Sequence, residues 1–331
     1  MKKVNFSDLF NEIYEKHGRE LKELHTNVVI KKIIIFIIMA LAEIFVFILM
    51  FVVLFVGFLL MNLVSRNYIR EFKNKAIRIL VESQNETYKY IPKRGMTSVE
   101  YNRSGFDTSW DHFYSEDYVS GNLGKNIKFK MSQVHTEEVQ ETRDSDGNTT
   151  RHNVTTFLGL YGIIEFPVEA KGTIMIVGNS VFRKFNASRI EMDSAEFEKT
   201  YDVLAEDRLW AIQMINSNVI EEFIELKNFF KKTIQVKVED NKVYFRIPCG
   251  DIFEPPKLKS GLDFDMLHKA FRIIDIPNIL TQTMIENIIM DSNDKNLKMN
   301  HIVEKMTDEQ KKEYEEVKQE EEEETYFTTK K

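Results

Sequence analysis

The side chains that could do hydrolytic chemistry in this sequence are acids and a histidine, far apart along the chain. Glu116 and Asp117 are adjacent, whereas His135 and Asp207 lie in other polar segments. Paired carboxylates can act as general acid and general base. Acids in such places more often cap helices or face solvent, and Ser115 before Glu116 suits an N-cap. The four acidic and histidine residues are the candidates if the protein is an enzyme, and no catalytic motif supports them.

Metal-binding patterns are also weak. Residues 144–148 (DSDGN) resemble the start of a calcium loop, but the glycine follows only two acids and lies between predicted strands. His112, His135 and His152 could converge on a metal only through tertiary structure, because no HExxH, HxH or CxxC pattern is present. Cys249 follows a proline and is expected to be a small buried apolar group. We therefore predict no metal and no cofactor.

Composition limits the classes of protein. The 331 residues carry a net charge of -7 and a single cysteine. A nucleic-acid-binding protein normally shows a basic face, so the acidic balance argues against nucleic acid as a partner. One cysteine excludes an intramolecular disulfide framework and suits a reducing compartment. The length allows one or two domains.

The apolar block Ile33–Val64 is the feature around which the chain is organised. It contains one ionisable residue, Glu43, and no proline. Because a bilayer core takes about 20 apolar helical residues, the block predicts a transmembrane anchor over residues 31–64. A single helix would be roughly 48 Å long, more than the bilayer core needs, whereas a short hairpin would turn near residues 47–50. Lysines and arginines flank both ends, which favours the hairpin.

The segments around this block have recognisable periods. Residues 6–27 and 68–82 carry apolar side chains at helical spacing, as do residues 218–231 and 264–290. Alternation in steps of two predicts a long hairpin from residues 126–142 and 155–168, and a second from 233–239 and 243–247. Further strands are expected at 172–177 and 189–192, and residues 203–216 are ambiguous.

These patterns predict an α+β fold, in which a transmembrane helical anchor precedes a soluble domain of mainly antiparallel β-hairpins with packed helices. The expected parts are an amphipathic arm (1–30), the anchor (31–64), a helical stalk (65–96), the α+β domain (97–300) and an acidic tail (301–331). The tail contains five consecutive glutamates, which are typical of a solvated helix or of disorder.

Several pieces of the chain resemble the bacterial membrane-anchored proteins of the domain-of-unknown-function family 3137. The pieces keep their order over most of the polar domain. They include FYSEDYVSG (113–121), KFKMSQVHTE (128–137), FLGLYGIIEF (157–166), FEKTYDVLAEDRLWA (197–211) and VYFRIPCGDIFEP (243–255). The resemblance implies two closely spaced membrane segments before the domain and a LemA-type membrane protein as a partner. It implies no catalytic residues.

The sequence therefore predicts a non-catalytic scaffold or binding module that presents a cytosolic α+β domain at a bacterial inner membrane. The alternative is a membrane-anchored hydrolase whose site assembles from dispersed carboxylates and histidines. The expected partners are the lipid bilayer and either a membrane protein or a second copy of the chain.

Overall fold

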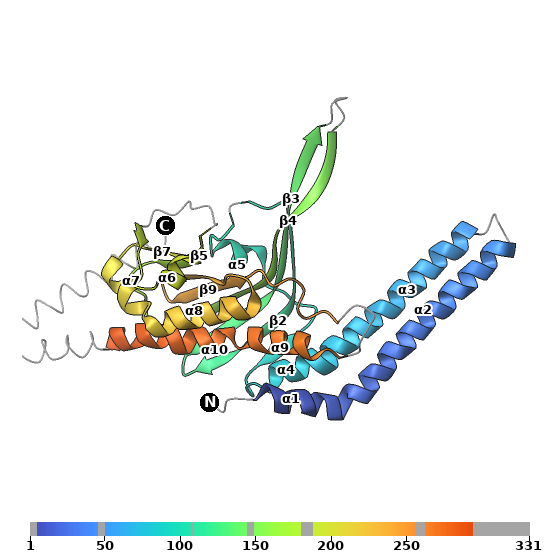
Figure 1. Cartoon of the computed structure of the whole chain (residues 1–331), viewed down its shortest axis with the longest axis horizontal. Coiled ribbons are helices and arrows are strands. Elements are labelled where there is room, and N and C mark those ends of the chain that lie inside the picture. The colour runs from blue at the N-terminus through green and yellow to red at the C-terminus, as the bar shows by residue number, and fades with distance from the viewer. Residues whose placement is uncertain are drawn as a thin grey trace, which may run out of the picture.

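An antiparallel sheet is the platform on which the rest of the chain packs (Figure 1). The computed structural model describes residues 5–45, 50–107, 109–143, 149–179, 188–255 and 262–293. Within these residues the sheet has nine strands in the order β1-β2-β3-β4-β9-β8-β5-β7-β6, and every neighbouring pair is antiparallel. The strands are β1 (Lys89–Ile91), β2 (His112–Gly124), β3 (Ile127–Arg143), β4 (Thr149–Glu165), β5 (Ile174–Gly178), β6 (Ser188–Ile190), β7 (Tyr201–Ala205), β8 (Gln235–Glu239) and β9 (Lys242–Ile247).

Both predicted hairpins form, which confirms the α+β part of the predicted fold class. Strands β3 and β4 pair from Lys128 with Glu165 to Arg143 with Thr149, and their far end extends beyond the body (Figure 1). The proposed tip, residues 144–148, lies outside the described residues. Strands β8 and β9 turn at Asp240, whose φ of 52° is the left-handed conformation that such tight turns need.

The two faces of the sheet bury different sets of side chains, because successive residues of a strand point to opposite faces. On one face, Phe129 and Phe245 join the main core beneath three helices and a π-helical turn. These are α8 (Ser217–Phe230), α9 (Phe264–Ile274), α10 (Ile276–Leu280) and η3 (Thr281–Ile285). On the other face, Val134 and Tyr244 contact a smaller core. Figure 1 shows the long helices covering the first face.

The remaining helices of the body are short. The smaller core is covered by α5 (Ser98–Asn102), which begins with a capping box between Thr97 and Glu100. The ambiguous stretch 203–216 is the end of β7 followed by α7 (Arg208–Met214). The short helix α6 (Ala195–Glu198) precedes β7.

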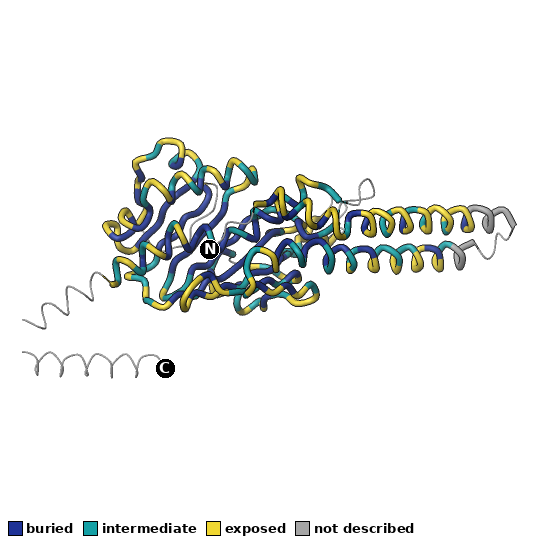
Figure 2. The backbone as a smooth tube through the Cα atoms, turned by 90° about the horizontal axis from the view of Figure 1, so that it is seen from below, coloured by how far each residue is buried: buried dark blue, intermediate teal, exposed yellow. Residues whose placement is uncertain are grey.

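Two long helices project from the sheet as a pair (Figures 1 and 2). The chain enters through α1 (Phe6–Ile13) and the π-helical turn η1 (Tyr14–Gly18), and then forms α2 (Arg19–Phe45) and α3 (Met50–Phe72). It returns to the body through η2 (Lys73–Ile77) and α4 (Arg78–Glu82). The rings of His25 and Tyr68 lie 5.6 Å apart. A Cβ on Gly57 would lie 2.0 Å from the sulfur of Met39, so glycine permits this close approach of α2 and α3.

The predicted transmembrane anchor over 31–64 is wrong for the described part of the chain. No helix there is both long enough and apolar enough to cross a bilayer. The physical reason is that the apolar block is divided between two helices, each of which also contains a polar portion. Helix α2 begins with charged residues and includes Lys31 and Lys32, whereas α3 continues through Ser65, Arg66 and Arg70. The transmembrane part of the predicted fold is therefore wrong for these residues, and residues 46–49, around the suggested turn, lie outside the described residues.

Candidate functional site

A buried lysine is the centre of the most unusual polar cluster in the described part of the chain. Lys73 is the first residue of η2, where α3 passes into a π-helical turn. Ile69, Lys73 and Ile77 follow one another at intervals of four residues and so lie on one face of the helix. Lys73 therefore lies within an apolar stripe. Only 4% of its surface is exposed. A buried ammonium is costly unless it is paired, so the fold must supply carboxylates.

Asp117 reaches Lys73 because of an irregularity in β2. The pairing register of β2 and β3 shifts between Glu116 and Val119, which marks a β-bulge. Asp117 has a φ of 57°, and its backbone N–H donates to the carbonyl oxygen of Pro92 at 3.0 Å rather than to the β3 ladder. Left-handed backbone is uncommon outside glycine, so the bulge stores some strain. In return, the carboxyl of Asp117 becomes fully buried.

Three carboxylates surround the Lys73 ammonium. The Nζ atom lies 2.7 Å from Oδ2 of Asp117, 2.6 Å from Oε1 of Glu254 and 3.4 Å from Oε1 of Glu116. The hydroxyl of Tyr90, which belongs to β1, donates to Oδ1 of Asp117. We call these five residues the Lys73 cluster. It joins the end of the α2–α3 pair to strands β1 and β2 and to the segment after β9.

Burial and ion pairing have opposite effects on the pKa values of Asp117 and Lys73 in the cluster. Burial raises the pKa of Asp117 to about 6, although the charge of Lys73 and the hydrogen bonds from Lys73 and Tyr90 oppose the rise. Burial alone would lower the pKa of Lys73, but the charge and hydrogen bond of Asp117, together with Glu254, outweigh it and raise that pKa. Burial, and then the charge of Asp117, raises the pKa of the Tyr90 hydroxyl, which therefore acts as a neutral donor.

The cluster has the donor set of a cation site. One ligand atom from each of Glu116, Asp117 and Glu254 lies within 4.8 Å of the others, and hard cations prefer such oxygen ligands. Here the lysine ammonium occupies the space between the carboxylates. The cation of this arrangement is therefore the Lys73 ammonium. Its ion pairs fix the α2–α3 pair to the sheet.

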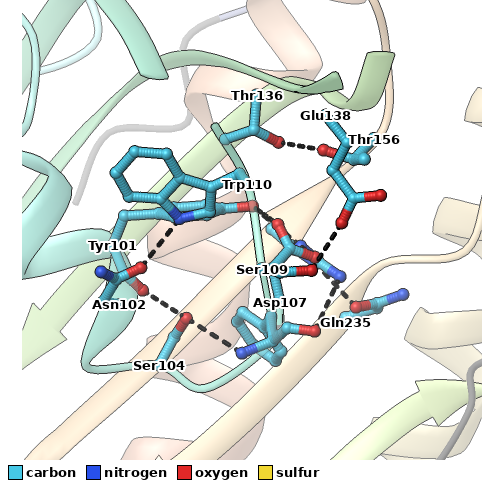
Figure 3. A network of polar contacts seen from close by, with 12 residues as sticks. Tyr101, Asn102, Ser104, Asp107, Ser109, Trp110, Thr136, Glu138, Thr156 and Gln235 are labelled. Carbon is cyan, nitrogen blue, oxygen red and sulfur yellow. Dashed lines mark hydrogen bonds and ion pairs between the residues drawn. The ribbon is translucent and has the colours of Figure 1, made fainter. Parts of the chain in front are cut away.

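A second buried network lies on the opposite face of the sheet (Figure 3). Arg246 of β9 donates to Gln235 at 2.8 Å, to the Tyr101 hydroxyl at 2.8 Å and to Asp107 at 2.6 Å. Its guanidinium lies between the rings of Phe106 and Phe157, at 5.0 and 4.9 Å from their centroids. Figure 3 shows Asn102 accepting a hydrogen bond from Trp110 beside this group. The contacts of Arg246 join the segment around Tyr101 and Asp107, which covers the smaller core, to β8 and β9.

The structure brings together only two of the four sequence-predicted candidates. Glu116 and Asp117 meet at Lys73, whereas Asp207 caps α7 by accepting from the Trp210 N–H at 3.0 Å. Asp207 follows β7, which is six positions from β2 in the strand order. His135 of β3 lies 3.0 Å from the Thr155 hydroxyl, on the projecting hairpin. The hydrolytic grouping of all four residues does not form.

The other sequence candidates are also separate. His152 pairs with Gln140, five residues along β3 from His135, which corresponds to about 17 Å. His112 of β2 pairs with Glu137 of β3, so the three histidines do not converge on one point. Cys249 is partly rather than fully buried and packs against the main core. Burial raises the pKa of its thiol to about 12, which makes the thiol a poor nucleophile.

Sequence reasoning missed Lys73, Tyr90 and Glu254. A signal for Lys73 was present, because a lysine inside an apolar helical stripe must find a buried partner. No local signal could identify that partner, since Asp117 is 44 residues away in the sequence. Glu254 is even farther along the chain.

The fold and the cluster define an α+β protein with an antiparallel sheet, in which Lys73 binds Glu116 and Asp117. Residues 155–288 match the model of a family described as protein of unknown function, DUF3137. This confirms the resemblance to family 3137 over those residues, which run from within β4 through η3. No curated protein matches the chain.

One solved structure similar to this chain is the crystal structure of the mycobacterial trehalose monomycolate transport factor A, TtfA. The two chains share 8% sequence identity, with a TM-score of 0.34. The match covers 64% of this chain and 93% of the other. A likeness at this level carries no argument about fold or function.

Proposed function

We propose that this protein is a non-catalytic binding module that docks on a lipid surface through the α2–α3 pair. The observation that carries the proposal is an exposed apolar zone on both helices, which we call the apolar arm. Its members are large apolar side chains that are 44% exposed or more: Ile30, Ile33, Ile34, Phe36, Ile37 and Ile38 of α2, and Phe55, Val56, Phe58, Leu59, Leu60 and Leu63 of α3.

The distribution of these side chains favours lipid over a protein partner. Contiguous exposed apolar surface usually marks an interaction site. The inner faces of α2 and α3 already contact each other through residues such as Val28, Met39 and Gly57. Figure 2 shows that the outer sides of the pair are largely exposed. The exposed apolar residues of α2 are nearly consecutive, from Ile33 to Ile38, so they spread around the helix, whereas a protein partner needs only one apolar stripe. Lipid acyl chains can surround the arm on all sides.

The length of the arm is compatible with insertion into the hydrocarbon core. In α2, the 16 residues from Ile30 to Phe45 rise about 24 Å at 1.5 Å per residue, less than a hydrocarbon core of about 30 Å. The proposal therefore requires no helix to cross the bilayer. Lys31, Lys32, Arg66 and Arg70 lie where the apolar arm meets the polar body. Cations at that level can contact headgroups while their apolar stems remain among the acyl chains.

The Lys73 cluster supports a binding rather than a hydrolytic role. Its carboxylates are occupied by an ammonium, and the remaining candidates, Asp207 and His135, lie on other elements. The cluster holds the base of the arm against the sheet, so an arm inserted in lipid would carry the sheet at a defined orientation.

Vesicle flotation tests the proposal. The full chain is diluted from mild detergent into phosphatidylcholine vesicles, and the floated fraction is measured for wild type and for Phe36→Asn/Phe58→Asn. We expect the wild type to float and the double variant to lose most of its binding, because the two rings are 66% and 58% exposed.

The matched control is Val99→Asn/Leu209→Asn, which removes two apolar side chains that are 62% and 75% exposed on α5 and α7, away from the arm. It should float like the wild type. Equal flotation of all three proteins would overturn the proposal. So would a wild type that stays unfloated and sediments as a dimer, because the arm would then be covered by a second copy.

A further inference from the structure

A cleft opens on α3 where the apolar arm meets the body. Its volume is about 820 Å³, within the range of small-molecule sites. One wall is a face of α3 that continues into η2, since Leu63, Arg66, Arg70 and Lys73 recur at spacings of three and four residues. The opposite wall is the end of β1 and the segment after it, with Ile91 and Lys93. We call this the basic cleft.

The charges of the basic cleft favour an anion. Arg66, Arg70 and Lys93 contribute three cations beside Lys73, which is already paired with Asp117, whereas the carboxylates that line the cleft are those of Glu116 and Glu254. Both carboxylates are bound to Lys73, at 3.4 and 2.6 Å. Arg70 lies 3.7 Å from Glu71. Arg66 and Lys93 are exposed and form no ion pair with any residue that the structure describes, so these two cations are available to a ligand.

The apolar side chains of the cleft indicate an amphiphile rather than a free anion. Leu63 and Ile91 are 61% and 41% exposed, and Ile69 also lines the cleft. Leu63 also belongs to the apolar arm, so the apolar wall is continuous with the surface that would contact acyl chains. A free phosphate would leave this apolar surface in water.

We infer that the basic cleft binds an anionic phospholipid, with its headgroup at Arg66 and Lys93 and the start of its acyl chains against Leu63 and Ile91. The inference rests on the proposed lipid docking and adds a lipid preference to it. Because the cleft opens at the polar end of the arm, its cations lie at headgroup level when the arm is inserted. Arg70 would contribute charge from the same helix face.

The test uses a soluble lipid, so that its outcome is separate from vesicle docking. Dihexanoyl phosphatidylglycerol below its micellar concentration is titrated into the full chain by calorimetry, beside dihexanoyl phosphatidylcholine and inorganic phosphate. We expect the phosphatidylglycerol to bind and the other two to bind at least tenfold more weakly. Arg66→Gln/Lys93→Gln should weaken phosphatidylglycerol binding about 25-fold, at about fivefold for each cation.

The control is Lys199→Gln/Arg208→Gln, which removes two exposed cations near β7 and has the same net charge as the test variant. It should bind like the wild type. Equal binding of the two lipids, equal loss in both double variants, or phosphate binding as tight as the anionic lipid would each overturn the inference. If the protein still floats with neutral vesicles but binds the two soluble lipids equally, only the inference about the basic cleft is refuted. The proposed docking of the arm would stand.

Discussion

Replacing Lys73 with methionine tests the argument that this lysine holds the arm to the sheet. The substitution keeps an unbranched apolar side chain but removes the ammonium. Asp117 is fully buried and the Lys73 side chain is 5% exposed, so solvent cannot compensate the carboxylate. Removal of one partner of a buried ion pair typically costs about 3–5 kcal/mol. We expect a loss of that size in the free energy of unfolding at pH 8.

The loss should depend on pH in a defined direction. The folded-state pKa of Asp117 is already raised to about 6, above an ordinary unfolded value of about 3.9, and it rises further when Lys73 is absent. A raised folded-state pKa gives stability that is present at low pH and is lost as pH rises through the folded value. Lys73→Met should therefore be less destabilising at pH 5 than at pH 8.

Urea unfolding followed by the fluorescence of the buried Trp210 would measure these changes. Asp117→Asn in the Lys73→Met background should recover stability at pH 8, because it removes the unpaired charge, and the double-mutant cycle would give the coupling energy of the pair. The control is Lys75→Met in the same turn. Its partner Glu20 is 53% exposed, so that variant should lose less than about 1 kcal/mol. Equal losses at both pH values, with no recovery in the double variant, would refute the reasoning.

Three further predictions concern other parts of the chain. Arg246→Met should lower the free energy of unfolding by about 3 kcal/mol in the same urea assay, because it leaves Asp107 without its cation; an unchanged midpoint would contradict a stabilising network. The Cys249 thiol, with its pKa raised to about 12, should react with iodoacetamide at pH 8 roughly a hundredfold more slowly in the folded chain than in urea, and equal rates would show an accessible thiolate. The predicted cytosolic location can be tested in a Cys249→Ser, Thr149→Cys chain with an impermeant thiol reagent. Labelling only after cells are permeabilised is expected, and labelling of intact cells would exclude it.

Much of the secondary structure could be predicted because it depends on local patterns. Alternating apolar residues indicated β3, β4, β8 and β9, since a half-buried strand needs one apolar face. The apolar stripe of residues 218–231 predicted α8, which spans Ser217–Phe230. The family resemblance was also contained in the sequence, and residues 155–288 confirm it.

The candidate site was only partly predictable. Glu116 and Asp117 stood out as adjacent acids, but their type alone suggested acid–base chemistry with His135 and Asp207. The β-bulge at Asp117 instead turns its carboxyl toward Lys73. A bulge depends on the pairing of two strands, so the sequence of β2 alone could not show it.

The sequence by itself determined the types of the strongly patterned elements, the apolar character of residues 33–64 and the absence of a recognisable catalytic motif. The tertiary structure decided the strand order, in which β4 pairs with β9 and β5 lies between β8 and β7. It also decided that the apolar block is shared by two helices, where composition alone had suggested an anchor. The physical reason is that periodicity records which face of an element is apolar, whereas the partner of that face, and of a buried charge such as Lys73, is chosen by the long-range packing of the whole chain.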